Sequence, residues 1–188
     1  MTDDPGAGRV PRPDPDHLTD AQRPVYDAIA GTRGQVRGPF LALLHVPGLA
    51  APVQELGQAV RFRSALPDAL RELAVLVTSR RWDAQFEWFA HAPIARDAGL
   101  SAATIEAILR EERPTDLDAR ATAVHDMARE LARTGAASDA TYAAAAAELS
   151  LEELVELSVV VGYYSMLAMV LGAHDLQPED GSRPLPPR

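Results

Sequence analysis

The sequence predicts an all-α protein, and three observations support that fold class. Apolar residues recur at helical spacing along most of the 188-residue chain. Alanine, leucine and glutamate outnumber the β-branched and aromatic residues that strands favour. No stretch shows the strict alternation of apolar and polar residues that is typical of a half-buried strand. Because 47% of the residues are hydrophobic, the chain can bury one substantial core, and a single domain is expected.

Capping residues mark the beginnings of the expected helices. Serine, threonine and aspartate side chains accept hydrogen bonds from the free N–H groups of a first turn, and proline is tolerated there. Gly99 stands where a left-handed residue would end one helix, and Pro93 falls inside that helix, where it would bend the axis. The expected starts are Thr19 or Asp20, Pro67 with Asp68, Ser101, and Ser150 in capping-box spacing with Glu153.

The two ends of the chain differ from the rest in composition. Residues 1–17 are acidic and proline-rich, so we expect a disordered or surface-draped arm. Residues 177–188 have a similar composition and predict a flexible tail, which leaves residues 18–176 as one all-α domain. The start lacks the apolar run of a signal peptide, and no segment is long and charge-free enough to span a bilayer. We therefore expect a cytoplasmic protein.

Charge and residue types exclude several classes of function. A formal net charge of −9 disfavours nucleic acid and anionic membranes as partners, because both require a basic surface. The absence of cysteine excludes disulfides, thiolate metal ligands and thiol nucleophiles. No two histidines have the spacing of metal ligands, and the chain has neither a phosphate-binding loop nor a dinucleotide fingerprint. The sequence therefore predicts no metal and no organic cofactor.

One acid–histidine pair has the residue types and spacing of a catalytic site. Glu87 and His91 are four residues apart in EWFAHAPIARDAG, so a helix places them on one face. Glu72 lies on the preceding helix, and an antiparallel hairpin joined near residues 82–84 would bring it opposite His91. In a dry pocket, a carboxylic acid and an imidazole can exchange protons with a substrate. The alternative is an ordinary buried ion pair, which this spacing also allows.

Five further side chains are candidates for substrate contact. Trp88 would wall a pocket, or belong to the core as aromatic residues at helical spacing usually do. Tyr164 would offer a hydroxyl to the pocket while Tyr163 packs elsewhere. Arg80 and Arg81 would bind a carboxylate, or simply place favourable charge at a helix C-terminus. The candidates are Trp88, Tyr164, Arg80, Arg81 and His45, the last lying either over the site or on the surface.

Residues 71–109 resemble the carboxymuconolactone decarboxylase and alkylhydroperoxidase D family. The resemblance rests on Arg71-Glu72, an apolar helix after them, and then FEWFAHAPIARDAGLSAATIEAIL. It extends to LVELSVVVGYYSMLAMVLGAH, which is similar to the family's second core helix with its Gly-Tyr pair. Residues 18–66 match only in being helical, and resemble the leader segment of longer members. The resemblance implies an AhpD-like helical bundle built on helical hairpins.

The resemblance also narrows the chemistry. In the peroxidase branch, cysteines stand seven and four residues before the histidine, where this chain has Ala84 and Glu87. A thiolate is required there, so thiol peroxidase activity is excluded. The decarboxylase branch is similar to this chain in having an acidic residue four before the histidine, whereas Glu72 is shared with the peroxidase branch.

Two classes of function follow from these observations. The first is a cofactor-free lyase or isomerase acting on a small lactone, carbonyl or carboxylated substrate, with Glu72, Glu87 and His91 as catalytic residues. The second is a non-catalytic binding or assembly module; a partner in peroxide chemistry that uses another protein's thiols is a third, weaker option. In either case ELSVVVGYYSMLAMVLG leaves broad apolar surface, which predicts self-association. The resemblance implies a trimer or hexamer, and a dimer is the alternative.

Overall fold

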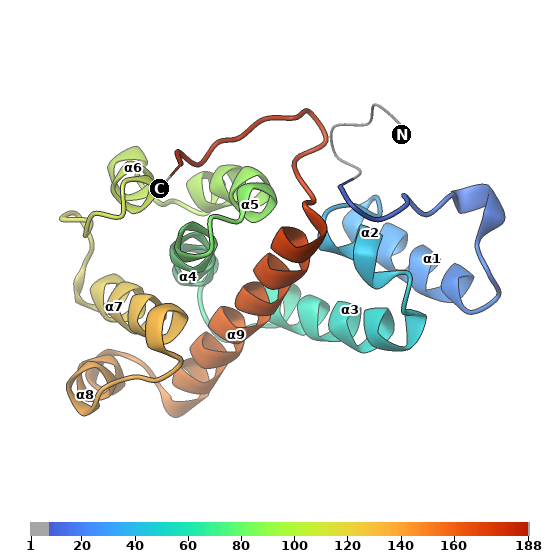
Figure 1. Ribbon diagram of the computed structural model, residues 1–188. Helices are drawn as coiled ribbons and strands as arrows, with labels where there is room; N and C mark the ends of the chain where they lie inside the picture. Colours follow the sequence, from blue (N-terminus) through green and yellow to red (C-terminus); the bar gives the residue numbers. More distant parts are fainter. Residues whose placement is uncertain (1–7, 188) are drawn as a thin grey trace.

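The structure, a computed structural model, describes residues 8–187, which form helices and loops without a strand. The expected all-α fold class is confirmed. Figure 1 shows the helices arranged around the long last helix, which crosses the molecule diagonally. A short 3-10 turn, Pro15–His17, precedes α1 (Gln22–Arg33), α2 (Pro39–Leu43), α3 (Pro47–Phe62), α4 (Asp68–Arg81), α5 (Gln85–Asp97), α6 (Ala102–Leu109), α7 (Ala119–Thr134), α8 (Asp139–Glu148) and α9 (Leu151–His174).

Helix α4 is the centre of the bundle. Its residues 70–80 are buried without interruption, because α5, α7 and α9 pack around it. The hydrophobic residues of α4 therefore lie on all sides rather than on one stripe, as expected for a fully enclosed helix. A turn of three residues, 82–84, connects α4 to α5, and Asp83 adopts a left-handed φ of 51° to reverse the chain. The expected hairpin between these helices is confirmed.

The first three helices lie on the other side of α9 from α6, α7 and α8 (Figure 1). Helices α2 and α3 contact α9 directly, while α1 packs on α3. Phe40 and Leu41 of α2 and Ala50 of α3 are buried in this contact region. The segment before residue 67 is thus part of the same packed body, and it forms a wall beside α5 and α9.

Most of the expected helix starts agree with the structure. The Ser101 hydroxyl accepts from the N–H of Thr104 at 2.9 Å, and Ser150 forms the expected capping box with Glu153. The regular part of α1 begins at Gln22, and Thr19 caps it as expected: Thr19 Oγ1 accepts from the N–H of Gln22 at 3.3 Å, and Gln22 Oε1 accepts from the N–H of Thr19 at 3.0 Å. Pro67 is the N-cap residue of α4 rather than part of its first turn.

The described parts of the two ends lie against the bundle. Residues 1–7 and 188 of the expected arm and tail lie outside the described residues. Arg9 donates its backbone N–H to the carbonyl oxygen of His174 at 2.7 Å, at the end of α9. In the C-terminal segment, Leu185 is 2% exposed and exchanges two hydrogen bonds with the side chain of Gln85. This segment crosses the start of α5 and is fixed there in the structure.

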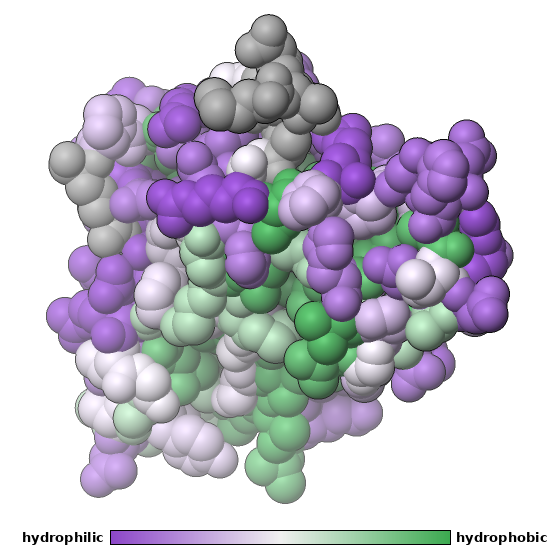
Figure 2. Space-filling model, turned by 45° about the vertical axis from the view of Figure 1, so that its right-hand side comes forward, coloured by the Kyte–Doolittle hydropathy of each residue, from purple (hydrophilic) through white to green (hydrophobic). Residues whose placement is uncertain are grey.

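Helix α9 is both the longest helix and the most apolar of the long ones. Among the described residues it alone has the length and composition to cross a membrane, but half of its most apolar stretch is buried within the bundle. A core helix has the same properties, so this is weak support for a membrane span. Figure 2 shows hydrophobic surface gathered on one face between hydrophilic margins. Exposed apolar side chains on α3 and α9 include Leu56, Phe62, Val155 and Val159, and self-association through them stays a prediction.

Candidate active site

The structure brings Glu72, Glu87 and His91 together. Glu72 projects from α4, and Glu87 and His91 project from one face of α5, one turn apart. The hairpin between α4 and α5 sets this meeting, because it runs the two helices antiparallel and in contact. All three side chains are buried, with exposed fractions of 1%, 3% and 4%. Carboxylates are rarely buried to this extent without a charged or hydrogen-bonded partner.

The two ring nitrogens of His91 have different partners. Nδ1 lies 2.7 Å from Glu72 Oε2, which is a hydrogen bond, whereas Nε2 lies 3.6 Å from Glu87 Oε2. A carboxylate only accepts hydrogen bonds, so Nδ1 carries the proton in this contact. When the ring is neutral, this leaves the lone pair on Nε2, on the side of Glu87. On the other side of Glu72, Arg71 Nη2 lies 3.5 Å from Oε1 and supplies a compensating positive charge.

Glu87 is the carboxyl group whose protonation is altered by the site. Burial raises its pKa above the ordinary value, since desolvation disfavours the carboxylate. The charges of His91, Arg33 and Arg61 oppose that effect, and the nearby Glu72 reinforces it. Glu72 is fixed by a hydrogen bond and a guanidinium, and the raised pKa of Glu87 favours its protonated form, which can donate a proton.

A cavity of about 320 Å³ opens beside this pair. Its volume lies at the lower end of the range for sites that bind small molecules. Tyr164 lines it and packs its ring edge-on to the ring of His91, with centroids 5.0 Å apart. The cavity wall consists of aromatic, apolar and arginine side chains from α1, α2, α3, α5 and α9, including Arg33, Phe40, Arg61, Phe86, Glu87, His91, Tyr163, Tyr164 and Leu167.

Arg33, Arg61 and Tyr163 are lining residues that the sequence analysis did not assign to the site. Arg33 ends α1 and resembles any basic residue in a last helical turn, and Arg61 has the same position in α3. Tyr163 was expected to pack while Tyr164 met the pocket, but both tyrosines line it. The sequence contained one usable signal, the adjacency of two tyrosines, whose side chains point in different directions. The arginines could be found only once α1 and α3 were placed against α5 and α9.

Two of the expected substrate contacts lie elsewhere. Trp88 is buried in the hydrophobic core and does not line the cavity. His45 is exposed and contacts the N-terminal segment, with Nε2 2.8 Å from the carbonyl oxygen of Pro11. Trp88 is therefore a core aromatic residue and His45 a surface residue, which are the alternatives given for them in the sequence analysis.

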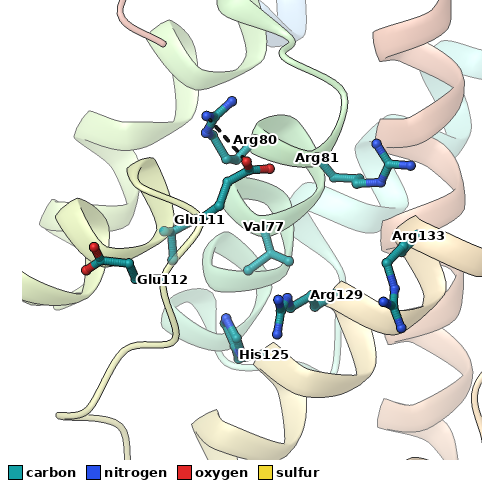
Figure 3. A pocket seen from close by; sticks show the side chains of 9 residues that line it. Val77, Arg80, Arg81, Glu111, Glu112, His125, Arg129 and Arg133 are labelled. Atoms are coloured by element: carbon teal, nitrogen blue, oxygen red, sulfur yellow. Dashed lines mark ion pairs between the residues drawn. The ribbon is translucent and has the colours of Figure 1, made fainter. Parts of the chain in front are cut away.

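Arg80 and Arg81 line a second cavity, of about 330 Å³, that does not include His91. Figure 3 shows them with Arg129, Arg133 and His125 of α7 around this cavity. Arg80 is held in place structurally, because Nε donates to the carbonyl oxygen of Leu109 at 2.8 Å and Nη2 lies 3.7 Å from Glu111 (Figure 3). The pair is therefore separate from the acid–histidine site. Within residues 8–187, no group of three or more His, Asp or Glu is arranged to hold a metal ion.

Comparison with known proteins connects this site to one family. Residues 47–130 match the model of the carboxymuconolactone decarboxylase family, which confirms the resemblance seen in the sequence, and the chain contains no cysteine. This stretch contains Glu72, Glu87 and His91. No curated protein matches the chain.

Solved structures show the same fold at low sequence identity. An alkylhydroperoxidase AhpD core protein from Ralstonia eutropha JMP134, an uncharacterized peroxidase-related protein, is 18% identical with a TM-score of 0.76, over 96% of this chain and 98% of that one. A peroxidase-related protein from Silicibacter sp. TM1040 is 18% identical with a TM-score of 0.75, over 98% and 99%. The debrominase Bmp8, as a cysteine-to-alanine variant with 2,3,4-tribromopyrrole, is 16% identical with a TM-score of 0.68, over 84% and 85%.

Proposed function

Since residues 47–130 belong to the carboxymuconolactone decarboxylase family, we propose that this protein is a cofactor-free lyase or isomerase. It transfers protons to and from a carbon atom of a small lactone, carbonyl or carboxylated substrate. The proposal rests on one observation, the buried Glu72–His91 hydrogen bond of 2.7 Å that directs Nε2 toward Glu87 at the cavity.

His91 is the base in this proposal and Glu72 orients it. The hydrogen bond from Nδ1 to Glu72 keeps the tautomer in which Nε2 is free to take a proton. When Nε2 gains that proton, the carboxylate of Glu72 stabilises the imidazolium that forms. Glu72 does not line the cavity, so its role is to position His91 rather than to contact substrate.

Glu87 is the acid. Its raised pKa keeps a larger fraction of the carboxyl group protonated than in water. In an isomerisation, His91 removes a proton from one carbon and Glu87 returns a proton to another. In a decarboxylation, the carbon–carboxylate bond breaks, its electron pair forms an enolate, and Glu87 or the protonated His91 delivers a proton to the carbon. Both reactions use the same pair and need no redox change.

Two covalent mechanisms are excluded by the composition of the chain. The chain has no cysteine, and all 18 of its basic residues other than histidine are arginine, so neither a thiolate nor a lysine Schiff base is available. The solved debrominase binds a small ring compound, 2,3,4-tribromopyrrole, on the same fold. Small ring substrates such as lactones suit a cavity of about 320 Å³ in this chain.

The test is proton exchange at carbon. The protein is incubated in D2O with a panel of lactone carboxylates and β-keto acids, and deuterium incorporation and CO2 release are followed by NMR. We expect incorporation with at least one compound, and a roughly 10²- to 10⁴-fold loss in His91→Gln. The control is His17→Gln, whose side chain is 82% exposed and distant in sequence from the site.

Two results separate the proposal from the alternative of a binding or assembly module. Unchanged exchange in His91→Gln would remove His91 from the mechanism. Binding of panel compounds with no exchange by the unmodified protein would favour the non-catalytic module.

A further inference from the structure

Two buried polar atoms at the cavity have no hydrogen-bond partner among the described residues. They are the Tyr163 hydroxyl and Nη2 of Arg33, both of which line the cavity of His91. Buried donors in folded proteins are nearly always paired, because an unpaired one loses its hydration without compensation. Arg33 and Tyr163 also interact with each other, which places their donors side by side. Two such donors without another partner, on residues that line a cavity, point to a ligand group that accepts hydrogen bonds.

Arg33 is held so that one end of its guanidinium stays available. Its Nε donates to Gln54 Oε1 at 2.7 Å, and its guanidinium carbon lies 4.6 Å from the ring centroid of Phe40. Gln54 is itself fixed, because its amide nitrogen donates to Thr32 Oγ1 at 2.6 Å. These contacts use Nε and one face of the group, and they leave Nη2 directed at Gly57 and Tyr163.

Tyr163 completes the pair as a second donor. Its ring packs edge-on against Tyr164, with centroids 5.3 Å apart, which fixes the position of its hydroxyl. Burial raises the pKa of Tyr163 to about 12, although the charge of Arg33 opposes this. The hydroxyl therefore keeps its proton at neutral pH and can donate it in a hydrogen bond.

The charged side chains that line the cavity favour an anionic ligand. Arg33, Arg37 and Arg61 line the cavity, whereas Glu87 is the single carboxyl group among its lining residues. Burial lowers the pKa of Arg33 because a desolvated cation is disfavoured, and a bound anion would offset that cost. A guanidinium beside a phenol hydroxyl fits a planar carboxylate, which accepts from both at once.

We propose that Arg33 and Tyr163 bind a carboxylate group of the substrate that is retained in the reaction. This inference rests on the proposed function and names its substrate class, a small organic acid. Its anchored carboxylate is not the one lost in a decarboxylation, because a guanidinium stabilises the charge that such a step must remove. The anchor instead places the reacting carbon toward Glu87 and His91, which line the same cavity.

Gly57 lets the two donors lie against the backbone of α3. A methyl group at Gly57 would overlap the Tyr163 hydroxyl and Nη2 of Arg33. Gly57 lies inside α3, where alanine is the better helix former, so the exchange carries no backbone penalty. Gly57→Ala is therefore a variant that displaces the two donors without removing a charge.

The experiment compares a carboxylate with its neutral isostere. Cyclohexanecarboxylate and cyclohexanecarboxamide are titrated into the full-length protein, and affinity is measured by calorimetry or NMR. We expect the carboxylate to bind at least about 10-fold more tightly than the amide. Arg33→Gln should lose about 10- to 100-fold in carboxylate affinity and Tyr163→Phe about 3- to 10-fold, with little change for the amide. Gly57→Ala should weaken carboxylate binding as well.

The controls distinguish this inference from the proposed function. Arg129→Gln alters an exposed arginine of the second cavity (Figure 3) and should bind the carboxylate as the unmodified protein does. His91→Gln should also retain carboxylate binding while it loses proton exchange. Should Arg33→Gln fail to fold by circular dichroism, Tyr163→Phe, which removes one oxygen atom, gives the answer.

Three outcomes would overturn the inference. They are equal binding of the amide and the carboxylate, full carboxylate affinity in both Arg33→Gln and Tyr163→Phe, and loss of carboxylate binding in Arg129→Gln. Arg33-dependent binding together with absent proton exchange would instead keep the carboxylate site and reject the catalytic proposal.

Discussion

Glu72→Gln tests how the site controls the tautomer of His91. Glu72 accepts the Nδ1 proton at 2.7 Å and can do nothing else as a carboxylate. A glutamine of the same shape offers Nδ1 either an oxygen or an N–H group, so the ring is no longer restricted to the tautomer with a free Nε2. In the other tautomer Nε2 carries the proton and cannot act as a base. We expect proton exchange to fall by about 10²- to 10⁴-fold.

The same change should have a moderate effect on folding. It replaces a hydrogen bond to a charged group, worth about 1.5–3 kcal/mol, with a neutral one worth about 0.5–1.5 kcal/mol. Arg71 loses one neighbouring carboxylate at 3.5 Å but keeps Asp68 at 2.8 Å. The free energy of unfolding should therefore fall by about 1–1.5 kcal/mol, which leaves a folded protein.

The assay is ¹⁵N NMR of the histidine rings, which distinguishes Nδ1–H from Nε2–H without any substrate. The His91 signals are assigned by their loss in His91→Gln. We expect the His91 ring to carry its proton on Nδ1 in the unmodified protein. In Glu72→Gln we expect either a mixture of the two tautomers or the proton on Nε2. An Nε2–H ring in the unmodified protein would refute the assignment of His91 as a base oriented by Glu72.

Two further predictions concern stability. Because the pKa of Glu87 is raised, the folded state holds the proton of its carboxyl group more tightly than the unfolded chain does. The protonated Glu87 therefore contributes fully to the free energy of unfolding below the ordinary pKa of 4.5, and this contribution is lost as pH rises through the raised pKa. Relative to Glu87→Gln, the unmodified protein should thus lose stability above pH 4.5, by up to about 1.4 kcal/mol per pH unit, in urea titrations across pH; a pH-independent difference would contradict the raised pKa. Ser150→Ala removes the cap of α9 and should lower stability by about 1 kcal/mol, or roughly 2–4 °C in Tm, whereas Ser158→Ala in the middle of that helix should cost less; equal losses would contradict the capping role.

The fold was predictable because its signals are local. Helical periodicity and caps such as Ser101 and the Ser150–Glu153 box depend on residues within a few positions of one another. The α4–α5 hairpin followed from a short connection between two apolar helices, and it brought Glu72 to His91 as expected. The cap of α1 was local in the same way, because Thr19 and Gln22 bond each other across three residues.

The cavity wall was less predictable because it depends on contacts between distant segments. Arg33 lies 58 residues before His91 in the chain, and nothing near it in the sequence distinguishes it from a solvated residue at a helix end. Arg80 and Arg81 had the opposite problem. They adjoin the catalytic hairpin in sequence, yet α4 directs them to the second cavity with α7. Proximity in the sequence therefore predicted correctly that Glu87 and His91 lie together, but it predicted wrongly that Arg80 and Arg81 lie beside them.

The energetic cost of the cavity supports a site rather than a packing accident. An unpaired buried donor costs about 1–3 kcal/mol, and both Arg33 and Tyr163 present one. Glu87 adds a buried carboxyl group with a raised pKa. Domains of this size are stable by only about 5–15 kcal/mol, so such groups use a large part of the available stability. Apolar side chains would fill the same volume without that cost, whereas a bound carboxylate would pair both donors and place its carbon skeleton beside the proton-transfer pair.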